Sequence, residues 1–190
     1  MSLVDLIAQA DERGLAAGGL ACLDRCVPLL GGDDEVLRPL WASLTDGGGD
    51  WGEALEKARA ALLDAQQPAG SPESVEDEAA LLARRMLGTA PAHYTDAGIR
   101  AWADACSVAS LRIHGLLDPA EDGDAHVDGP REGRTEGMSP LVAAELRRQV
   151  TVLELLAEHD AVGLRRALEV SVEGRRVLRA VVSRRARGRS

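Results

Sequence analysis

The fold is decided by residues 37–44 (LRPLWASL), the glycine hinge 46–49 (DGGG) and residues 51–67 (WGEALEKARAALLDAQQ). Apolar residues in the last segment recur at spacings of three and four, as they do along the buried face of a helix. Asp50 precedes this segment and Glu53 follows three residues later, which is a capping-box pattern. The stretch therefore predicts two helices folded back on each other as an antiparallel hairpin.

Helical periodicity continues through most of the chain. No segment shows the alternating apolar pattern of a strand with one face in solvent. Phe is absent, and Trp and Tyr together total four residues, so the core must be built from Leu, Val and Ala. We predict an all-α fold, an irregular bundle of about eight helices built from antiparallel helical hairpins.

Composition divides the chain into three regions. Residues 1–117 are the predicted helical core, with the most apolar helix, residues 95–116, at its centre. Residues 118–138 hold seven acidic residues, four glycines and two prolines. Such a stretch buries too little apolar surface to offset its ordering entropy, so it predicts a flexible acidic linker. Residues 139–190 predict a basic two-helix unit that packs on the core.

Charge is divided unequally between these regions. Residues 1–138 carry 11 basic and 25 acidic groups, a net charge of −14, whereas residues 139–190 carry 11 basic and 6 acidic groups, a net charge of +5. The predicted basic tail consists of Arg175, Arg176, Arg179, Arg184 and Arg185. These arginines can attract nucleic acid, or they can fold back on acidic positions such as Asp11, Glu12 and Asp46. No aromatic residue follows Trp102, so stacking on single-stranded bases has no support.

The location of the protein is expected to be cytoplasmic. Three cysteines give no even-numbered disulfide framework, and the acidic N-terminus has no long apolar run that would predict a signal peptide. The longest runs without a charged residue are ten residues long, which is too short to span a bilayer. We expect no membrane partner.

A partial repeat links the hairpin to the residues before it. A shift of 35 residues aligns Gly14 with Gly49 and Leu20 with Leu55, a period typical of two-helix repeats. With its small residues at 54, 58 and 61, the run 49–62 resembles the second helix of a tetratricopeptide repeat, and the resemblance covers residues 3–66. A third copy is not in register, so a repeat array and an ordinary helical bundle both stay open.

The resemblance implies that the paired helices line a peptide-binding groove. The family's groove positions fall on five residues of this chain: Ala8, Asp11, Glu12, Ser43 and Asp46. Three of them are acidic, so the resemblance implies a basic protein partner.

Residues able to carry chemistry are scattered. Cys22 and Cys26 share a helical face, but zinc takes four ligands and no other donor lies nearby in sequence, so we interpret them as core residues. His114 lies on the central helix and is interpreted as a satisfied histidine. The chain has no phosphate loop, nucleophile elbow or metal-binding helix motif. We predict no catalytic residue, metal ligand or cofactor, and enzymatic activity is disfavoured without being excluded.

These observations favour a non-enzymatic protein-interaction or regulatory protein. One alternative is a nucleic-acid-binding regulator that uses the Arg-rich C-terminal helix. Another is a small-molecule-binding protein or enzyme with a pocket between helices around Trp102 and His114. We expect a protein partner and rank nucleic acid below it; self-association stays open.

Overall fold

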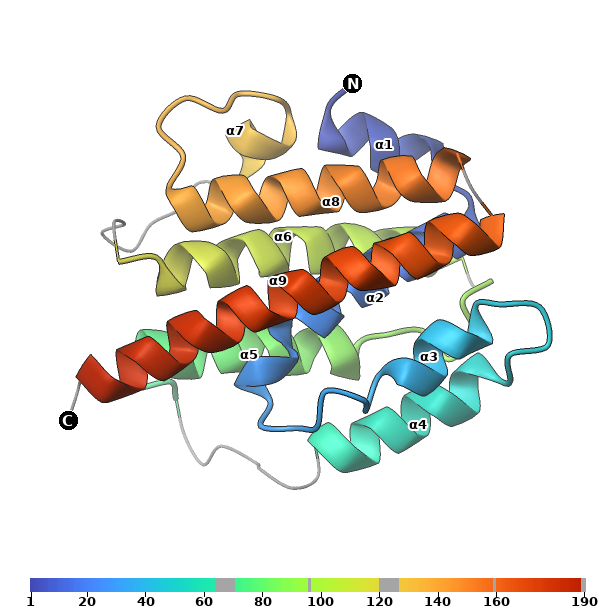
Figure 1. Cartoon of the computed structure of the whole chain (residues 1–190), viewed down its shortest axis with the longest axis horizontal. Coiled ribbons are helices and arrows are strands. Elements are labelled where there is room, and N and C mark those ends of the chain that lie inside the picture. The colour runs from blue at the N-terminus through green and yellow to red at the C-terminus, as the bar shows by residue number, and fades with distance from the viewer. Residues whose placement is uncertain (64–70, 96, 120–126, 159, 189–190) are drawn as a thin grey trace.

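The computed structural model describes residues 1–63, 71–95, 97–119, 127–158 and 160–188. In these ranges the chain forms α-helices and one short 3-10 turn, with no strand, and this confirms the predicted all-α fold (Figure 1). The helices are α1 (Leu3–Gln9), α2 (Glu12–Cys26), α3 (Arg38–Ser43), α4 (Trp51–Leu62), α5 (Val75–Gly88), α6 (Ile99–Leu117), α7 (Asp128–Arg131), α8 (Pro140–Glu158) and α9 (Asp160–Gly188).

The centre of the bundle is α2. The sequence had predicted the helix of residues 95–116 at the centre, and the corresponding helix, α6, packs beside α2. In α2, 12 of 15 residues are buried, whereas α6 buries 11 of 19. α2 packs against α5, α6, α8 and α9. Its small residues let neighbours approach on all sides: a Cβ at Gly19 would lie 2.5 Å from Cζ3 of Trp102. A helix that is apolar all round is buried all round.

The predicted hairpin is formed by α3 and α4, which pack against each other. The Asp50 carboxylate accepts a hydrogen bond from the Glu53 backbone N–H at 2.7 Å and caps α4 as predicted. Gly47 and Gly49 adopt φ angles of +74° and +107°, a region that favours glycine, and they turn the chain between the helices. The predicted end of the second helix, residues 64–67, lies outside the described residues.

The longest helix, α9, has 29 residues and spans about 43 Å. It crosses the front of the bundle diagonally in Figure 1 and packs against α2 and α8. α8 in turn packs against α1, α2 and α6. The basic C-terminal residues are therefore part of the same packed body as α2.

The predicted linker is partly helical. Residues 120–126 lie outside the described residues, but residues 128–131 form α7, and Val127 and Arg131 are buried. The Arg131 guanidinium pairs with Asp104 and donates to Ser107 Oγ at 3.3 Å, both on α6. This anchoring to α6 explains why residues 127–131 differ from the predicted flexible linker.

The predicted repeat involves α1 and α2 as well as the hairpin. In the structure, α1 packs against α8 and α6, and α3 packs against α4. The resemblance to tetratricopeptide helices stays a prediction.

Candidate functional site

The interior of the bundle contains an ion pair between Arg25 of α2 and Glu145 of α8. Arg25 Nε donates to Oε2 of Glu145 at 2.8 Å, and Nη2 donates to Oε1 at 2.7 Å. Both side chains are 0% exposed. Burial alone would raise the pKa of Glu145, but the Arg25 guanidinium and the surrounding donors lower it to about 2. The pair is therefore charged at neutral pH and joins α2 to α8.

Hydrogen bonds extend this pair into a network across α6 and α8. Ser110 Oγ and Gln149 Nε2 donate to Oε1 of Glu145 at 2.7 Å and 2.9 Å. Ser107 Oγ donates to Gln149 Oε1 at 2.7 Å. Each acceptor of the carboxylate is thus used inside the protein, as buried polar groups require.

His114 lies at the edge of the network. Its Nδ1 is 2.7 Å from the Ser110 carbonyl, which can only accept, so Nδ1 carries the proton. Nε2 is 3.6 Å from Glu145 Oε2 and makes no hydrogen bond with the described part of the chain. Burial lowers the pKa of His114, although the charge of Glu145 opposes this effect. The imidazole is therefore neutral at pH 7.

The three cysteines are also buried. Burial raises the pKa of the Cys22 thiol to about 12, and it raises the pKa values of Cys26 and Cys106 as well. Within the residues that the structure describes, no group of three or more His, Cys, Asp or Glu side chains could hold a metal ion. These thiols are protonated, unreactive core residues.

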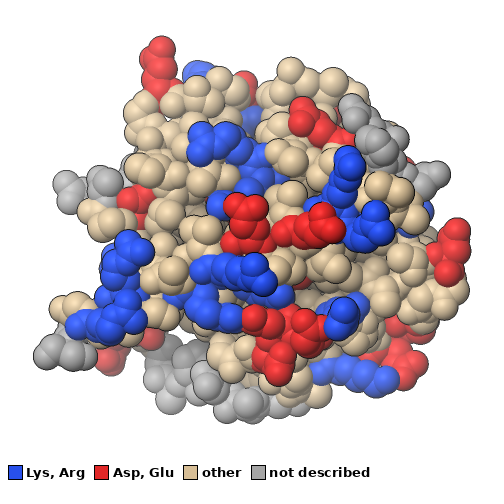
Figure 2. All heavy atoms as spheres, in the orientation of Figure 1, with Lys and Arg blue, Asp and Glu red and all other residues tan. Residues whose placement is uncertain are grey.

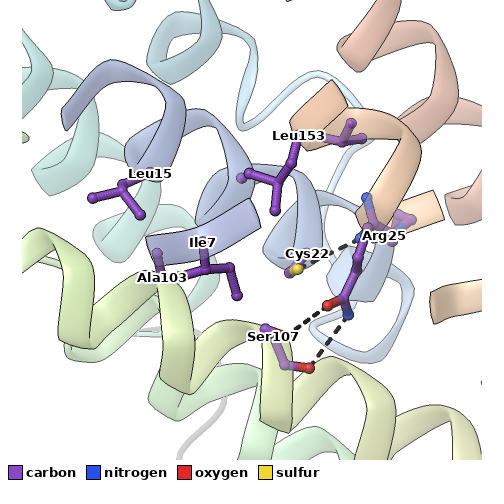
Figure 3. Close-up of a pocket in the computed structure, with 10 residues that line it drawn as sticks. Ile7, Leu15, Cys22, Arg25, Ala103, Ser107 and Leu153 are labelled. Carbon is purple, nitrogen blue, oxygen red and sulfur yellow. Dashed lines mark hydrogen bonds between the residues drawn. The ribbon is translucent and has the colours of Figure 1, made fainter. Parts of the chain in front are cut away.

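A small cavity borders the network (Figure 3). Cys22, Arg25 and Ser107 line it together with apolar side chains that include Ile7 and Leu153. Its volume is about 20 Å³, which is room for about one water molecule. The network fixes the positions of α2, α6 and α8 and leaves no space here for a substrate.

A second set of ion pairs holds α9 against α2. Arg175 Nη1 donates to Asp24 Oδ1 at 2.7 Å and to the Asp34 carbonyl at 2.6 Å. Trp41 Nε1 donates to Asp24 Oδ2 at 2.7 Å. Burial raises the pKa of Asp24, and the charge of Arg175 opposes that rise.

The basic tail is divided between inward and outward arginines. Arg175 is buried, Arg179 pairs with Asp34, and Arg185 Nε donates to Glu76 at 2.7 Å. Arg176 and Arg184 are exposed. Figure 2 shows basic and acidic side chains side by side on the face that α9 crosses, and basic side chains at the C-terminal end of α9.

The tail folds back on acidic residues other than those proposed from the sequence. Its acidic partners are Asp24, Asp34 and Glu76. The sequence-based hypothesis had named Asp11, Glu12 and Asp46. Those three are exposed, whereas Asp24 and Asp34 lie on or just after α2, beside α9.

The residues predicted to bind a partner lie apart from any described hollow. Asp11 caps α2 by accepting from the Gly14 N–H at 2.6 Å, and Ser43 is buried and donates to the Leu40 carbonyl. Glu12 and Asp46 are exposed. Their role in binding stays a prediction.

An apolar groove with a volume of about 360 Å³ lies between α5 and α6. It is lined by Leu82, Arg85, Met86, Thr89, Ala105, Cys106, Val108, Ala109 and Arg112. The contacts of Arg112 with Glu78 and of Trp102 with the Met86 carbonyl show that the two helices run antiparallel. The apolar lining residues include Ala105, Val108 and Ala109 of α6 and Leu82 and Met86 of α5, and the arginines Arg85 and Arg112 are exposed.

Trp102 and His114, around which the sequence suggested a pocket, lie apart from this groove. Those residues are 12 positions apart on α6, or about 18 Å along its axis. Neither of them lines the groove. Trp102 packs edge-on against Trp51, and His114 belongs to the buried network.

Sequence reasoning missed the buried charges. α2 is almost wholly apolar from Gly14 onward, so its two late charges, Asp24 and Arg25, had to be buried and paired. On α8, Glu145 and Gln149 lie on the same stripe as Val142 and Leu146, which marks them as interior residues. No comparable sequence pattern on α5 or α6 indicated the groove.

Comparisons with known proteins give no match: no family model matches the chain, and no curated protein or solved structure is significantly similar to it. Among the described residues, no helix is both long enough and apolar enough to cross a membrane.

Proposed function

We propose that this chain is a non-enzymatic protein-interaction protein that binds its partner through the α5–α6 groove. The observation that carries the proposal is the groove itself, an apolar hollow of about 360 Å³ on the surface of a closed bundle. Clefts of this volume, lined mostly by apolar side chains with a few polar groups, are typical of binding sites. The groove also lies on rigid helices, which suits a binding surface.

The distribution of reactive groups supports a non-enzymatic role. The interior groups that could perform acid–base or nucleophilic chemistry, such as Glu145, His114 and Cys22, are fully buried and away from solvent. The groove is lined by the polar residues Arg85, Thr89 and Arg112 and by Cys106, whose thiol has a pKa that burial raises. They do not include a nucleophile paired with a base, which catalysis of group transfer would need.

The nucleic-acid alternative has weaker support. Three of the five tail arginines are engaged in ion pairs with Asp24, Asp34 and Glu76, which leaves fewer charges for phosphates. A filter-binding titration at low and high salt measures this alternative. The proposed location is the cytoplasm, because the three cysteines are free thiols.

The test uses affinity capture with the tagged full chain and two matched variants. Ala105→Arg places a long charged side chain in the groove, and Ala180→Arg makes the same change on the outer face of α9; both alanines are exposed and helical. We expect the wild type and Ala180→Arg to retain a partner that Ala105→Arg loses. Identical capture by all three proteins, or none by the wild type, would refute the groove as the binding surface.

A further inference from the structure

The length of the groove indicates what kind of segment fits it. It extends along α5 from Leu82 to Thr89 and along α6 from Ala105 to Arg112. Each stretch advances seven residues, or about 10.5 Å. A partner helix covers the same distance between positions i and i+7. Its apolar side chains at i, i+3 or i+4, and i+7 would therefore all fall within the groove.

The two walls differ in a way that suits a helix. On α6, Ala105 and Ala109 have short side chains, so another backbone can approach closely. On α5, the half-buried Leu82 and the buried Met86 supply larger apolar side chains at the floor of the groove. A helix lying in the groove would place its anchors against Leu82 and Met86 and its backbone above the alanines.

The charges at the rims indicate the polar character of the partner. Arg85 of α5 is exposed and has no ion pair with the described residues. The Arg112 side chain is 51% exposed, and its distance to Glu78 Oε1 is 3.9 Å, a weak contact in solvent. Because α5 and α6 are antiparallel, Arg112 stands near the Glu78 end of the groove and Arg85 lies toward the other end.

We propose that the groove binds an amphipathic α-helix of a protein partner, with apolar anchors at i, i+3 or i+4, and i+7 and with acidic residues at both flanks. This inference rests on the proposed function and names the partner of that site. Acidic flanks would meet Arg85 and Arg112 without displacing an interior ion pair. The partner differs from the basic one that the repeat resemblance implies, because the rim charges here are positive.

A second copy of this chain is a poorer occupant. Two such grooves facing each other would bring the arginines of both copies into one interface, where like charges repel. A fatty carboxylate would fill the apolar floor and use only one arginine. Sedimentation and a titration with decanoate distinguish these two occupants from a partner helix.

The test is selection from a displayed library of helical peptides of about 16 residues, with apolar residues fixed at i, i+4 and i+7 and flanks randomised. The full chain serves as bait, and binders that also bind Ala105→Arg are removed. Affinities of the selected peptides are then measured by fluorescence anisotropy for the wild type, Ala180→Arg and the double variant Arg85→Glu/Arg112→Glu.

We expect the selected flanks to be rich in Asp and Glu. The double charge reversal should weaken binding about tenfold, and Ala180→Arg should leave it unchanged. Groove-dependent peptides with neutral or basic flanks would overturn this inference and leave the proposed function standing. Failure to select any groove-dependent peptide would overturn the inference, and the capture experiment would then decide the proposed function separately.

Two further measurements exclude the other occupants. Sedimentation of the wild type and Ala105→Arg should give the same mass; a dimer lost in Ala105→Arg would assign the groove to a second copy. Titration with decanoate should not displace a selected peptide. Displacement at concentrations below those at which decanoate forms micelles would assign the groove to a small amphiphile.

Discussion

The two faces of α6 differ in whether their side chains have contact partners inside the protein. On one face, Ser107, Ser110 and His114 enter a buried network around the Arg25–Glu145 pair. On another face, Ala105 and Ala109 line a groove that contains no protein atoms. The side chains of the first face are buried and contact partners inside the protein, so this face contributes to folding. The second face lines an open groove, which is where we propose that the partner binds.

The largest expected effect comes from breaking the buried pair. Glu145→Gln leaves the Arg25 guanidinium without a compensating charge, so we expect the free energy of unfolding to fall by about 3–5 kcal/mol. Urea denaturation measures it. Glu53→Gln is the matched control, because the Glu53–Lys57 pair is 67% and 70% exposed. The control should cost less than about 1 kcal/mol, and equal losses in both variants would contradict the structural role of the network.

The next effect concerns the space that α9 leaves for Arg25. A Cβ at Gly174 would overlap Cδ of Arg25 and lie 3.0 Å from Cδ of Arg148. We expect Gly174→Ala to destabilise the protein by about 1–3 kcal/mol, even though alanine is the better helix former. Gly188→Ala on the same helix meets no atom within 4 Å and serves as the control. If Gly174→Ala unfolds at the same urea concentration as the wild type, then α9 does not pack this closely on Arg25.

A smaller effect follows from the pKa of His114. Burial lowers this pKa in the folded state, so the unfolded chain binds the proton more readily and stability falls as pH drops below the unfolded value of about 6.5. His114→Gln removes that contribution. We expect the urea midpoint of the wild type to fall more than that of the variant between about pH 7.5 and about pH 5. Parallel pH profiles would show that His114 does not titrate in this way.

The smallest effect on stability is expected in the groove. Ala105→Arg and Arg85→Glu change exposed side chains, so each should alter the free energy of unfolding by no more than about 0.5 kcal/mol. Thermal or urea unfolding measures this directly. A larger loss would mean that the groove contributes to folding, and the contrast between the two faces of α6 would fail.

Local features of the structure followed from the sequence better than distant ones. The Asp50 cap and the glycine turn were predicted because each depends on residues a few positions apart. The start of α5 is also set locally, because Ser74 caps the helix by accepting a hydrogen bond from the Asp77 N–H three residues later.

The candidate site could not be predicted in the same way. The Arg25–Glu145 pair joins residues 120 positions apart, so no local pattern could identify the partner. The groove depends on the spacing between α5 and α6, which no periodicity in either helix specifies. The apolar character of α2 is a signal from which the burial of Arg25 could have been inferred, but no inference was drawn from it.

In this protein the buried network maintains the fold, and we propose that the groove binds the partner. The double variant Arg25→Met/Glu145→Leu tests this division of roles most directly, because it removes both charges together and avoids leaving one unpaired. A groove-selected peptide should bind the folded double variant with the affinity it has for the wild type. Loss of peptide binding by a double variant that is still folded would contradict the claim.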